Sequence, residues 1–325
     1  MKGLVAKVSG DSVEDYLCQR FGDRFREYRR LWQVPEITGE VLDFPVHLDF
    51  ELNDICNQRC IMCPRNASHL TLYPGGITVN TGQRLGYDAF CRIIDESVPK
   101  GVVSINIGAF AEPLIHPEVA RMIKYAHDHG IIDSRLITNG VLLKPELAEK
   151  ILESGLIRLY VSVDAFKPET YKRIRGAGFE SVKKNLLHFM RLRNQGKTGG
   201  LPWVRVSFVE MPENAAEKEE FIAYWRGKVD HVDIQKYVKP DLVFDQELLK
   251  KHKQFKCVDP WRRLSVRANG DILPCCAFSG ELLRLGNIRS MTIEQAWRSP
   301  KMQEIREGII HDSSPVCSIC QRGIY

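Results

Sequence analysis

The chain has 325 residues, of which 44% are hydrophobic and 27% are charged, a composition typical of a globular protein with a large core. Its 46 basic and 41 acidic residues leave a small, dispersed net charge of +5, which does not favour a nucleic-acid partner. The apolar runs are far shorter than the roughly 20 residues that span a bilayer, and the N-terminus lacks a signal-peptide core. We therefore expect a cytoplasmic protein without a membrane partner, whose ten cysteines serve metal or redox sites rather than disulfides.

The first predicted element is an amphipathic helix over residues 12–32. Apolar residues recur at helical spacing from Val13 to Leu31, and a short proline-containing connector follows. We assign residues 1–45 to an N-terminal helical extension and expect a lid or flap without chemistry of its own.

From residue 46 the pattern alternates between strand and helix six times. Such units favour a parallel α/β sheet, and in a closed or partly closed barrel the active site lies at the carboxyl ends of the strands. Periodicity alone leaves open six or eight strands, and a barrel or an open sheet. The predicted strands are Val46–Leu52, Val102–Gly108, Ser134–Thr138, Ile157–Asp164, Val204–Glu210 and Val232–Tyr237. The predicted helices are Asp88–Val98, Pro117–Asp128, Pro145–Glu153, Glu169–Arg193 with a break at Gly176–Gly178, and Ala215–Gly227.

Three cysteines follow the first predicted strand directly. Cys56, Cys60 and Cys63 are separated by three residues and then by two. Three thiolates are one ligand short of a fully ligated [4Fe–4S] cluster, so one iron stays open to an outside ligand. A structural zinc site is the alternative, and His69 is the nearest candidate for the fourth ligand that zinc requires.

This cysteine spacing, placed after a strand, resembles the signature of radical S-adenosylmethionine (SAM) enzymes. The resemblance implies a six-stranded partial (β/α)6 TIM-like barrel, which we expect over residues 46–240. It also implies that the open iron of the [4Fe–4S] cluster chelates SAM, and that one electron cleaves SAM to a 5′-deoxyadenosyl radical that abstracts hydrogen from a C–H bond. An external one-electron reductant such as flavodoxin or ferredoxin is then an implied partner.

Other segments at predicted strand ends resemble the parts of that family that hold SAM. The stretch from Gly108 to Pro113 resembles its Gly-Gly-Glu-Pro segment, with Phe110 and Ala111 where glycines are usual. By the resemblance, the backbone of this segment binds the methionyl ammonium of SAM, and other side chains contact its ribose, carboxylate and adenine. The SAM-binding residues implied in this way are Met62, Ala111, Glu112, Asn139, Ser162, Asp164 and Arg175.

Four of these residues have plainer alternative interpretations. Glu112 is compatible with a surface charge, and Asn139 precedes Gly140 in a strong turn signal. Ser162 is compatible with a helix cap or turn hydroxyl, and Met62 with core packing.

Five of the ten cysteines lie after residue 250, in a proline-rich region. Four of them, Cys257, Cys275, Cys317 and Cys320, resemble the ligands of the SPASM and twitch auxiliary-cluster domains of radical SAM enzymes. We therefore assign residues 241–325 to a small auxiliary domain with a second [4Fe–4S] cluster, whose full ligation suits electron transfer. Zinc is again the alternative, because four cysteines with one C-x-x-C pair are also a zinc pattern.

One cysteine in this region is spare by spacing. Cys276 directly follows the predicted ligand Cys275. A thiol beside a substrate can donate a hydrogen atom to a carbon radical, which an epimerase requires; the alternative is a buried cysteine that packs as a small hydrophobe.

We interpret the chain as a radical SAM enzyme that abstracts hydrogen from a small polar substrate. The family members with a single auxiliary cluster, which this chain resembles, include epimerases and dehydrogenases of amino sugars, aminocyclitols and aminoglycosides. Modification of a peptide or protein is one alternative, and a non-enzymatic iron–sulfur electron carrier is the other. We expect the substrate between SAM and the auxiliary domain, near Glu210, Gln235 and Tyr237 at the ends of the last two strands.

Overall fold

Nine strands form one sheet in the computed structural model, which describes residues 13–65, 81–196, 199–237 and 257–317. Their order in the sheet is β6-β5-β4-β3-β2-β1-β7-β8-β9, and the pairs from β6 to β7 are parallel whereas β7-β8-β9 are antiparallel. The six predicted strands are all present. The strands are β1 (His47–Phe50), β2 (Ser104–Ile107), β3 (Asp133–Thr138), β4 (Arg158–Ser162), β5 (Trp203–Glu210), β6 (His231–Lys236), β7 (Arg263–Val266), β8 (Asp271–Leu273) and β9 (Gly286–Asn287).

The predicted helices between the strands are also present. The break expected at Gly176–Gly178 separates two helices, because Gly178 has a left-handed backbone with φ 110° that favours glycine. The helices are α1 (Val13–Phe21), α2 (Asp23–Thr38), α4 (Tyr87–Ser97), α5 (Val119–Asp128), α6 (Pro145–Glu153), α7 (Pro168–Ile174), α8 (Phe179–Gln195), α9 (Lys218–Trp225), α11 (Ile293–Trp297) and α12 (Pro300–Ile310).

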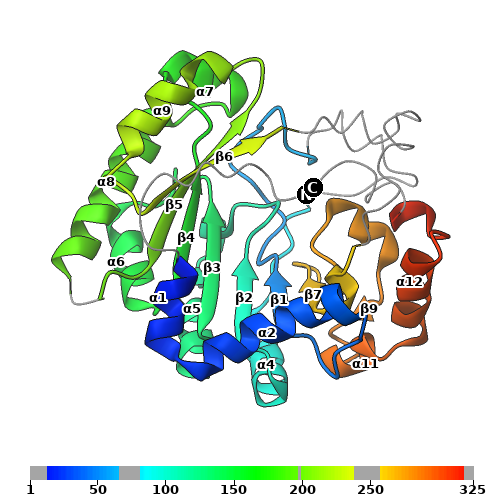
Figure 1. Ribbon diagram of the computed structural model, residues 1–325. Coiled ribbons are helices and arrows are strands. Elements are labelled where there is room, and N and C mark those ends of the chain that lie inside the picture. Colours follow the sequence, from blue (N-terminus) through cyan, green and yellow to red (C-terminus); the bar gives the residue numbers. More distant parts are fainter. Residues whose placement is uncertain (1–12, 66–80, 197–198, 238–256, 318–325) are drawn as a thin grey trace.

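The parallel strands have one apolar and one polar face, because successive side chains point to opposite sides. Phe50, Ile107 and Val161 belong to the apolar face, whose core is shared with helices such as α4 and α8 (Figure 1). We call the opposite face the inner face. The sheet does not close on itself, since β6 and β9 lie at its two ends. This arrangement is consistent with the predicted partial barrel.

The N-terminal region differs from its prediction in two ways. Residues 12–32 do not form one helix, because Gly22 separates α1 from α2 with φ 58° and ψ −136°, a conformation open mainly to glycine. The expected lid over the active site is also wrong. Leu17, Phe25 and Tyr28 pack against residues that precede the strands, so these helices cover the amino ends of the strands, opposite the cysteine loop. The residues they contact at these ends are Val46, Ile132, Ile157 and Leu201.

The C-terminal elements continue the barrel sheet. Strand β7 pairs in parallel with β1, from His47 opposite Arg263 to Phe50 opposite Val266. Trp297 of α11 lies in the same core as the barrel residues, and Figure 1 shows β7 beside β1, with β9 and α12 farther from β1 on the same side. The expected domain boundary at residue 240 lies outside the described residues. In the described parts of the chain, no helix is both long and apolar enough to cross a membrane.

Candidate active site

The three cysteines Cys56, Cys60 and Cys63 lie in one loop after the carboxyl end of β1. The backbone N–H of Cys63 donates to the Cys60 carbonyl at 3.1 Å, and the Ile61 N–H donates to the Ile174 carbonyl at 2.9 Å, which fastens the loop to α7. Burial raises the pKa of each thiol, to about 11 for Cys60, and the charges of neighbouring cysteines raise the pKa of Cys56 and Cys60 further. The three sulfurs therefore lie within electrostatic range of one another. In the described residues no three His, Cys, Asp or Glu side chains lie close enough to hold a single metal ion, whereas the cysteine ligands of a [4Fe–4S] cluster each bind a different iron.

A buried carboxylate that sequence reasoning missed orders the segment after β2. Glu51 accepts hydrogen bonds from the backbone N–H groups of Ala109 at 2.6 Å, Phe110 at 2.9 Å and Ala111 at 3.2 Å. Neither Phe110 nor Ala111 has a positive φ, so this chain does not need glycine at these two positions. Gly108 does have φ 77°, and a Cβ there would lie 2.8 Å from the Pro113 side chain.

Glu112 joins three loops at the carboxyl ends of the strands. Its carboxylate accepts from the Thr138 hydroxyl at 2.6 Å and from the N–H groups of Asn139 at 2.8 Å and Leu114 at 3.1 Å. Its carbonyl accepts from the Asn53 amide at 2.9 Å. Burial raises the pKa of Glu112 to about 7. The Glu112 side chain thus joins the segments that follow β2 and β3, and its role in binding SAM stays a prediction.

Asn139 connects the loop after β3 to the cysteine loop. Its amide donates to the Asn57 side chain at 2.7 Å, while its carbonyl oxygen accepts from the Val141 N–H at 3.0 Å. These contacts hold Asn139 close to the cysteine loop, and they fit both the predicted SAM role and the turn interpretation.

Asp164 and Arg175 form a buried ion pair beside the cysteine loop. Arg175 Nε donates to Asp164 at 2.7 Å, and its Nη1 lies 3.5 Å from the Cys60 sulfur. Asp164 also accepts from the Val209 N–H at 2.7 Å, and its φ of 61° is rare for a residue other than glycine. Although burial opposes the charged guanidinium, Asp164 and Cys60 hold the pKa of Arg175 above its usual value.

The remaining residues predicted to bind SAM are near the same edge. Ser162 ends β4 on the inner face and is partly exposed. Met62 is half-buried in the turn between Cys60 and Cys63. Nothing in their contacts decides between the SAM roles and the plainer interpretations.

The side chains of the three predicted substrate residues do not share one face of the sheet, although the Tyr237 N–H donates to the Glu210 carbonyl at 3.2 Å. Glu210 pairs with Lys218 next to α9 at 2.9 Å, so its side chain is directed to the helix side of the sheet. Gln235 is exposed and donates to Asp233 at 2.7 Å on the opposite face. Tyr237 directly follows β6 and is partly exposed.

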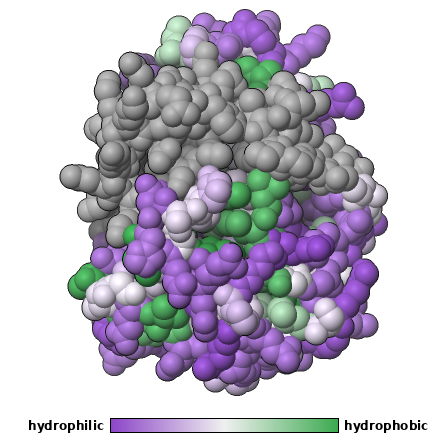
Figure 2. Space-filling model, turned by 90° about the vertical axis from the view of Figure 1, so that its right-hand side faces the viewer, coloured by the Kyte–Doolittle hydropathy of each residue, from purple (hydrophilic) through white to green (hydrophobic). Residues whose placement is uncertain are grey.

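Three of the predicted auxiliary ligands line one pocket. Cys257, Cys275 and Cys317 share it with mostly apolar side chains, whereas Cys320 lies outside the described residues. The face that carries α12 is largely hydrophilic and has a hydrophobic patch near its middle (Figure 2). The other pocket residues are Pro260, Pro274, Ser279, Leu283, Ile305, Ile309 and Val316.

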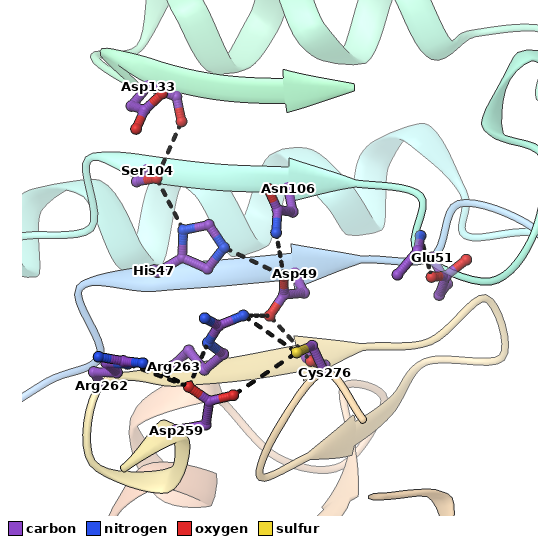
Figure 3. Close-up of polar contacts among 12 residues, drawn as sticks. His47, Asp49, Glu51, Ser104, Asn106, Asp133, Asp259, Arg262, Arg263 and Cys276 are labelled. Atoms are coloured by element: carbon purple, nitrogen blue, oxygen red, sulfur yellow. Dashed lines mark hydrogen bonds and ion pairs between the residues drawn. The ribbon is translucent and has the colours of Figure 1, made fainter. Parts of the chain in front are cut away.

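Cys276 points away from that pocket. Its sulfur lies 3.3 Å from Arg263 Nη1 and 3.8 Å from an Asp259 oxygen, while Arg263 reaches Asp49 of β1 at 3.5 Å (Figure 3). Desolvation raises the pKa of Cys276 to about 12. The side chains of these adjacent cysteines therefore lie in different environments, Cys275 in the apolar pocket and Cys276 next to the inner face.

Sequence reasoning also missed the polar network that begins at Asp49. His47 lies 3.2 Å from Asp49 Oδ1 and 2.8 Å from the Ser104 hydroxyl, and the Asn106 amide donates to Asp49 at 2.8 Å (Figure 3). Although burial opposes ionisation, Arg263 and His47 hold the pKa of Asp49 well below its usual range. Burial lowers the pKa of His47.

Two protein families match this chain. The profile of the radical SAM superfamily matches residues 50–202, and that of the SPASM iron–sulfur cluster-binding domain matches residues 257–321. The chain is a radical SAM protein with a C-terminal SPASM domain. Its fold and its cofactors follow from this membership: a SAM-binding [4Fe–4S] cluster, an auxiliary iron–sulfur cluster and SAM.

Similar proteins have diverse activities. A probable GTP 3′,8-cyclase of Methanococcus vannielii is 30% identical over 52% of this chain and 51% of that protein. The mycofactocin maturase MftC of Mycobacterium ulcerans is 27% identical over 56% of this chain and 44% of that protein. The match thus spans about half the length of such relatives. The crystal structure of Streptococcus suis SuiB bound to precursor peptide SuiA has the same fold, with a TM-score of 0.63, 15% identity, and coverage of 94% of this chain and 76% of that one.

The side chains of this chain fit both iron–sulfur clusters. Thiolates are the ligands that iron–sulfur clusters require. In the cysteine loop, three thiols gather beside backbone groups that Glu51 and Glu112 hold in place. Cys56, Cys60 and Cys63 would hold the first cluster, and Cys257, Cys275 and Cys317, with Cys320, would hold the second.

Proposed function

We propose that this radical SAM enzyme abstracts hydrogen from a small polar substrate of the amino sugar, aminocyclitol or aminoglycoside type, and that it inverts the reacting carbon. The clusters and SAM, when bound, supply the electron and the 5′-deoxyadenosyl radical for this abstraction. The residues of the chain bind the substrate, exclude water and return a hydrogen atom. Oxidation to a carbonyl is the alternative outcome.

The polarity of the inner face is the observation that carries the proposal. Hydroxyl and amine groups of such a substrate need hydrogen-bond partners when they leave water, and each unmet partner costs about 1–3 kcal/mol. Polar side chains at most inner-face positions of the parallel strands, and directly after β1 and β7, can supply these partners. They are His47, Asp49, Glu51, Ser104, Asn106, Asp133, Arg135, Arg158, Tyr160, Ser162, Arg205, Ser207, Asp233, Arg263, Ser265 and Arg267.

The direction of the Cys276 side chain supports inversion. Its sulfur adjoins Arg263 of the inner face, which in turn reaches Asp49, and it does not line the pocket of Cys275. In the proposed step the S–H bond breaks and a C–H bond forms on the substrate radical. The thiyl radical left on Cys276 returns to a thiol with one proton and one electron from an external reductant of the flavodoxin or ferredoxin type.

Peptide modification is the second candidate, favoured by the similarity to MftC and by the fold of SuiB. The two candidates differ in which compounds increase SAM cleavage. Reduced, reconstituted enzyme should form more 5′-deoxyadenosine with members of a panel of amino sugars, aminocyclitols and aminoglycosides than with a panel of peptides. A response to peptides alone would contradict the small-molecule proposal.

With a responsive substrate, the reaction in D₂O distinguishes inversion from oxidation. Inversion through Cys276 places one deuterium on carbon, because the thiol hydrogen exchanges with water. Cys276→Ala should then stop turnover after hydrogen abstraction. A carbonyl product without deuterium, formed by an active Cys276→Ala variant, would establish oxidation instead.

A further inference from the structure

The inner face of β3, β4 and β5 has more positive than negative charge. Arg158 of β4 donates to Asp133 of β3 through two bonds, of 2.5 and 2.8 Å. Arg205 of β5 pairs with Asp233 of β6 at 2.9 Å. The nearby Arg135 of β3 has no ion-pair partner among the residues that the structure describes. Three cations therefore face two acids, so the group has a net positive charge, although Asp133 also interacts with Arg135 at longer range.

Two of these arginines each carry a buried nitrogen without a hydrogen-bond partner. These nitrogens are the Nε atoms of Arg135 and Arg205. Burial lowers the pKa of Arg205, and the charges of Arg135 and Arg158 lower it further. Arg135 itself is only partly buried, and a bound anion would supply hydrogen-bond partners to both guanidinium groups.

Tyr160 packs against both of these arginines. The guanidinium carbons of Arg205 and Arg135 lie 3.7 and 5.1 Å from the centroid of its ring. Although burial opposes ionisation, Arg135, Arg158 and Arg205 bring the pKa of Tyr160 below its usual value. The phenol is therefore a good hydrogen-bond donor next to two cationic donors.

The position of this cluster relative to SAM suits a substrate. Tyr160 precedes Ser162 by two residues on the same face of β4. At a rise of about 3.3 Å per residue, the cluster lies about 7 Å deeper than the strand end. A small molecule held there by one end can place a carbon near the SAM site at its other end.

We propose that Arg135, Arg205 and the Tyr160 hydroxyl form an oxyanion subsite, and that the substrate therefore carries a phosphate or carboxylate group. This inference rests on the proposed function, because it assigns one end of the same substrate. It narrows the expected class to acidic derivatives of polar carbinols, such as a sugar bound to phosphate. Arg-rich sites are suited to both anions, because the guanidinium fork matches phosphate and carboxylate geometry.

Calorimetric titration of reconstituted protein with pyrophosphate and with malonate tests the subsite. At least one of the two should bind, and Arg135→Met should weaken its binding at least tenfold. Tyr160→Phe keeps the ring and should weaken binding by a smaller factor, about three- to tenfold for a lost hydrogen bond. Arg191→Met on the exposed surface of α8 is the matched control and should bind as the wild type does. Stronger binding of pyrophosphate indicates a phosphate-bearing substrate, and stronger binding of malonate indicates a carboxylate.

Thermal unfolding separates a binding role from a structural one. Arg135→Met should leave the Tm of the anion-free protein unchanged or higher, because the arginine has no ion-pair partner among the described residues. Arg158→Met should lower it, because Asp133 loses its partner. Wild-type affinity for the anion in Arg135→Met, or no anion binding to the wild type, would overturn the subsite. Reductive SAM cleavage by the same samples without substrate should be equal, so loss of the subsite is distinguishable from failure of the radical chemistry.

Discussion

The carboxyl group of Glu112 gives the site its clearest pH dependence. In the unfolded chain it loses its proton near pH 4.5, but burial raises its pKa in the folded protein to about 7. The folded state therefore binds more protons between these values, and its stability falls as the pH rises through this range. A shift of this size corresponds to about 3 kcal/mol at 1.36 kcal/mol for each pH unit.

Glu112→Gln should remove most of this dependence. Urea unfolding at pH 5 and pH 7.5 should show that the wild type loses about 2–3 kcal/mol more than the variant between the two conditions. Glu153→Gln, at an exposed position of α6, should keep the wild-type loss. An equal loss in Glu112→Gln and the wild type would contradict the assigned role of burial.

Individual site residues could be predicted from sequence only where a motif marks them. The cysteine spacing identified Cys56, Cys60 and Cys63, but Glu51 and Asp49 were interpreted as parts of an apolar strand. A signal was available, because His47, Asp49 and Glu51 alternate with apolar residues and so share one face. Their partners could not be predicted, since Arg263 is more than 200 residues away in the sequence.

Among the helices, α1 and α2 cover the end of the barrel where the strands begin. Phe25 of α2 is fully buried against the residues that precede the strands. Phe25→Ala should lower the free energy of unfolding by about 3–5 kcal/mol, the usual cost of such a cavity. The folded variant should still cleave SAM at the wild-type rate, because the helices lie opposite the cysteine loop. A selective loss of SAM cleavage in a folded variant would restore the lid interpretation.

Local patterns explain why most elements were predicted. Alternating and helical spacing located the six strands to within a few residues, and two glycines marked the break before α8. The break at Gly22 was missed because the apolar spacing continues on both sides of it. The pairing of β7 with β1 depends on contacts between distant segments, which no local pattern encodes.

Because the chain matches two families that each bind an iron–sulfur cluster, it should carry two clusters. Anaerobically reconstituted protein should contain about eight iron and eight sulfide if both are [4Fe–4S] clusters. Replacing Cys56, Cys60 and Cys63 together with alanine should leave about half. Stoichiometric zinc without iron at the C-terminal cysteines would contradict the electron-transfer role of the auxiliary site.

We also predict that the cysteine loop cleaves SAM and that the auxiliary cluster is needed only for product formation. Cys317 lies in the auxiliary pocket, away from the loop of Cys60. Cys317→Ala should therefore retain some SAM cleavage while product formation stops, which chromatography of both products can measure. Normal product formation by Cys317→Ala would mean that the auxiliary cluster is not needed for turnover.

The most direct test is reductive SAM cleavage by the reconstituted protein. With dithionite or a reduced flavodoxin, the wild type should convert SAM to 5′-deoxyadenosine and methionine. Cys60→Ala should abolish this conversion because the loop can no longer hold its cluster, and Cys18→Ala, in α1, should preserve it. Conversion by Cys60→Ala at the wild-type rate, or none by fully reconstituted wild type, would contradict the assignment of this loop as the radical-generating site.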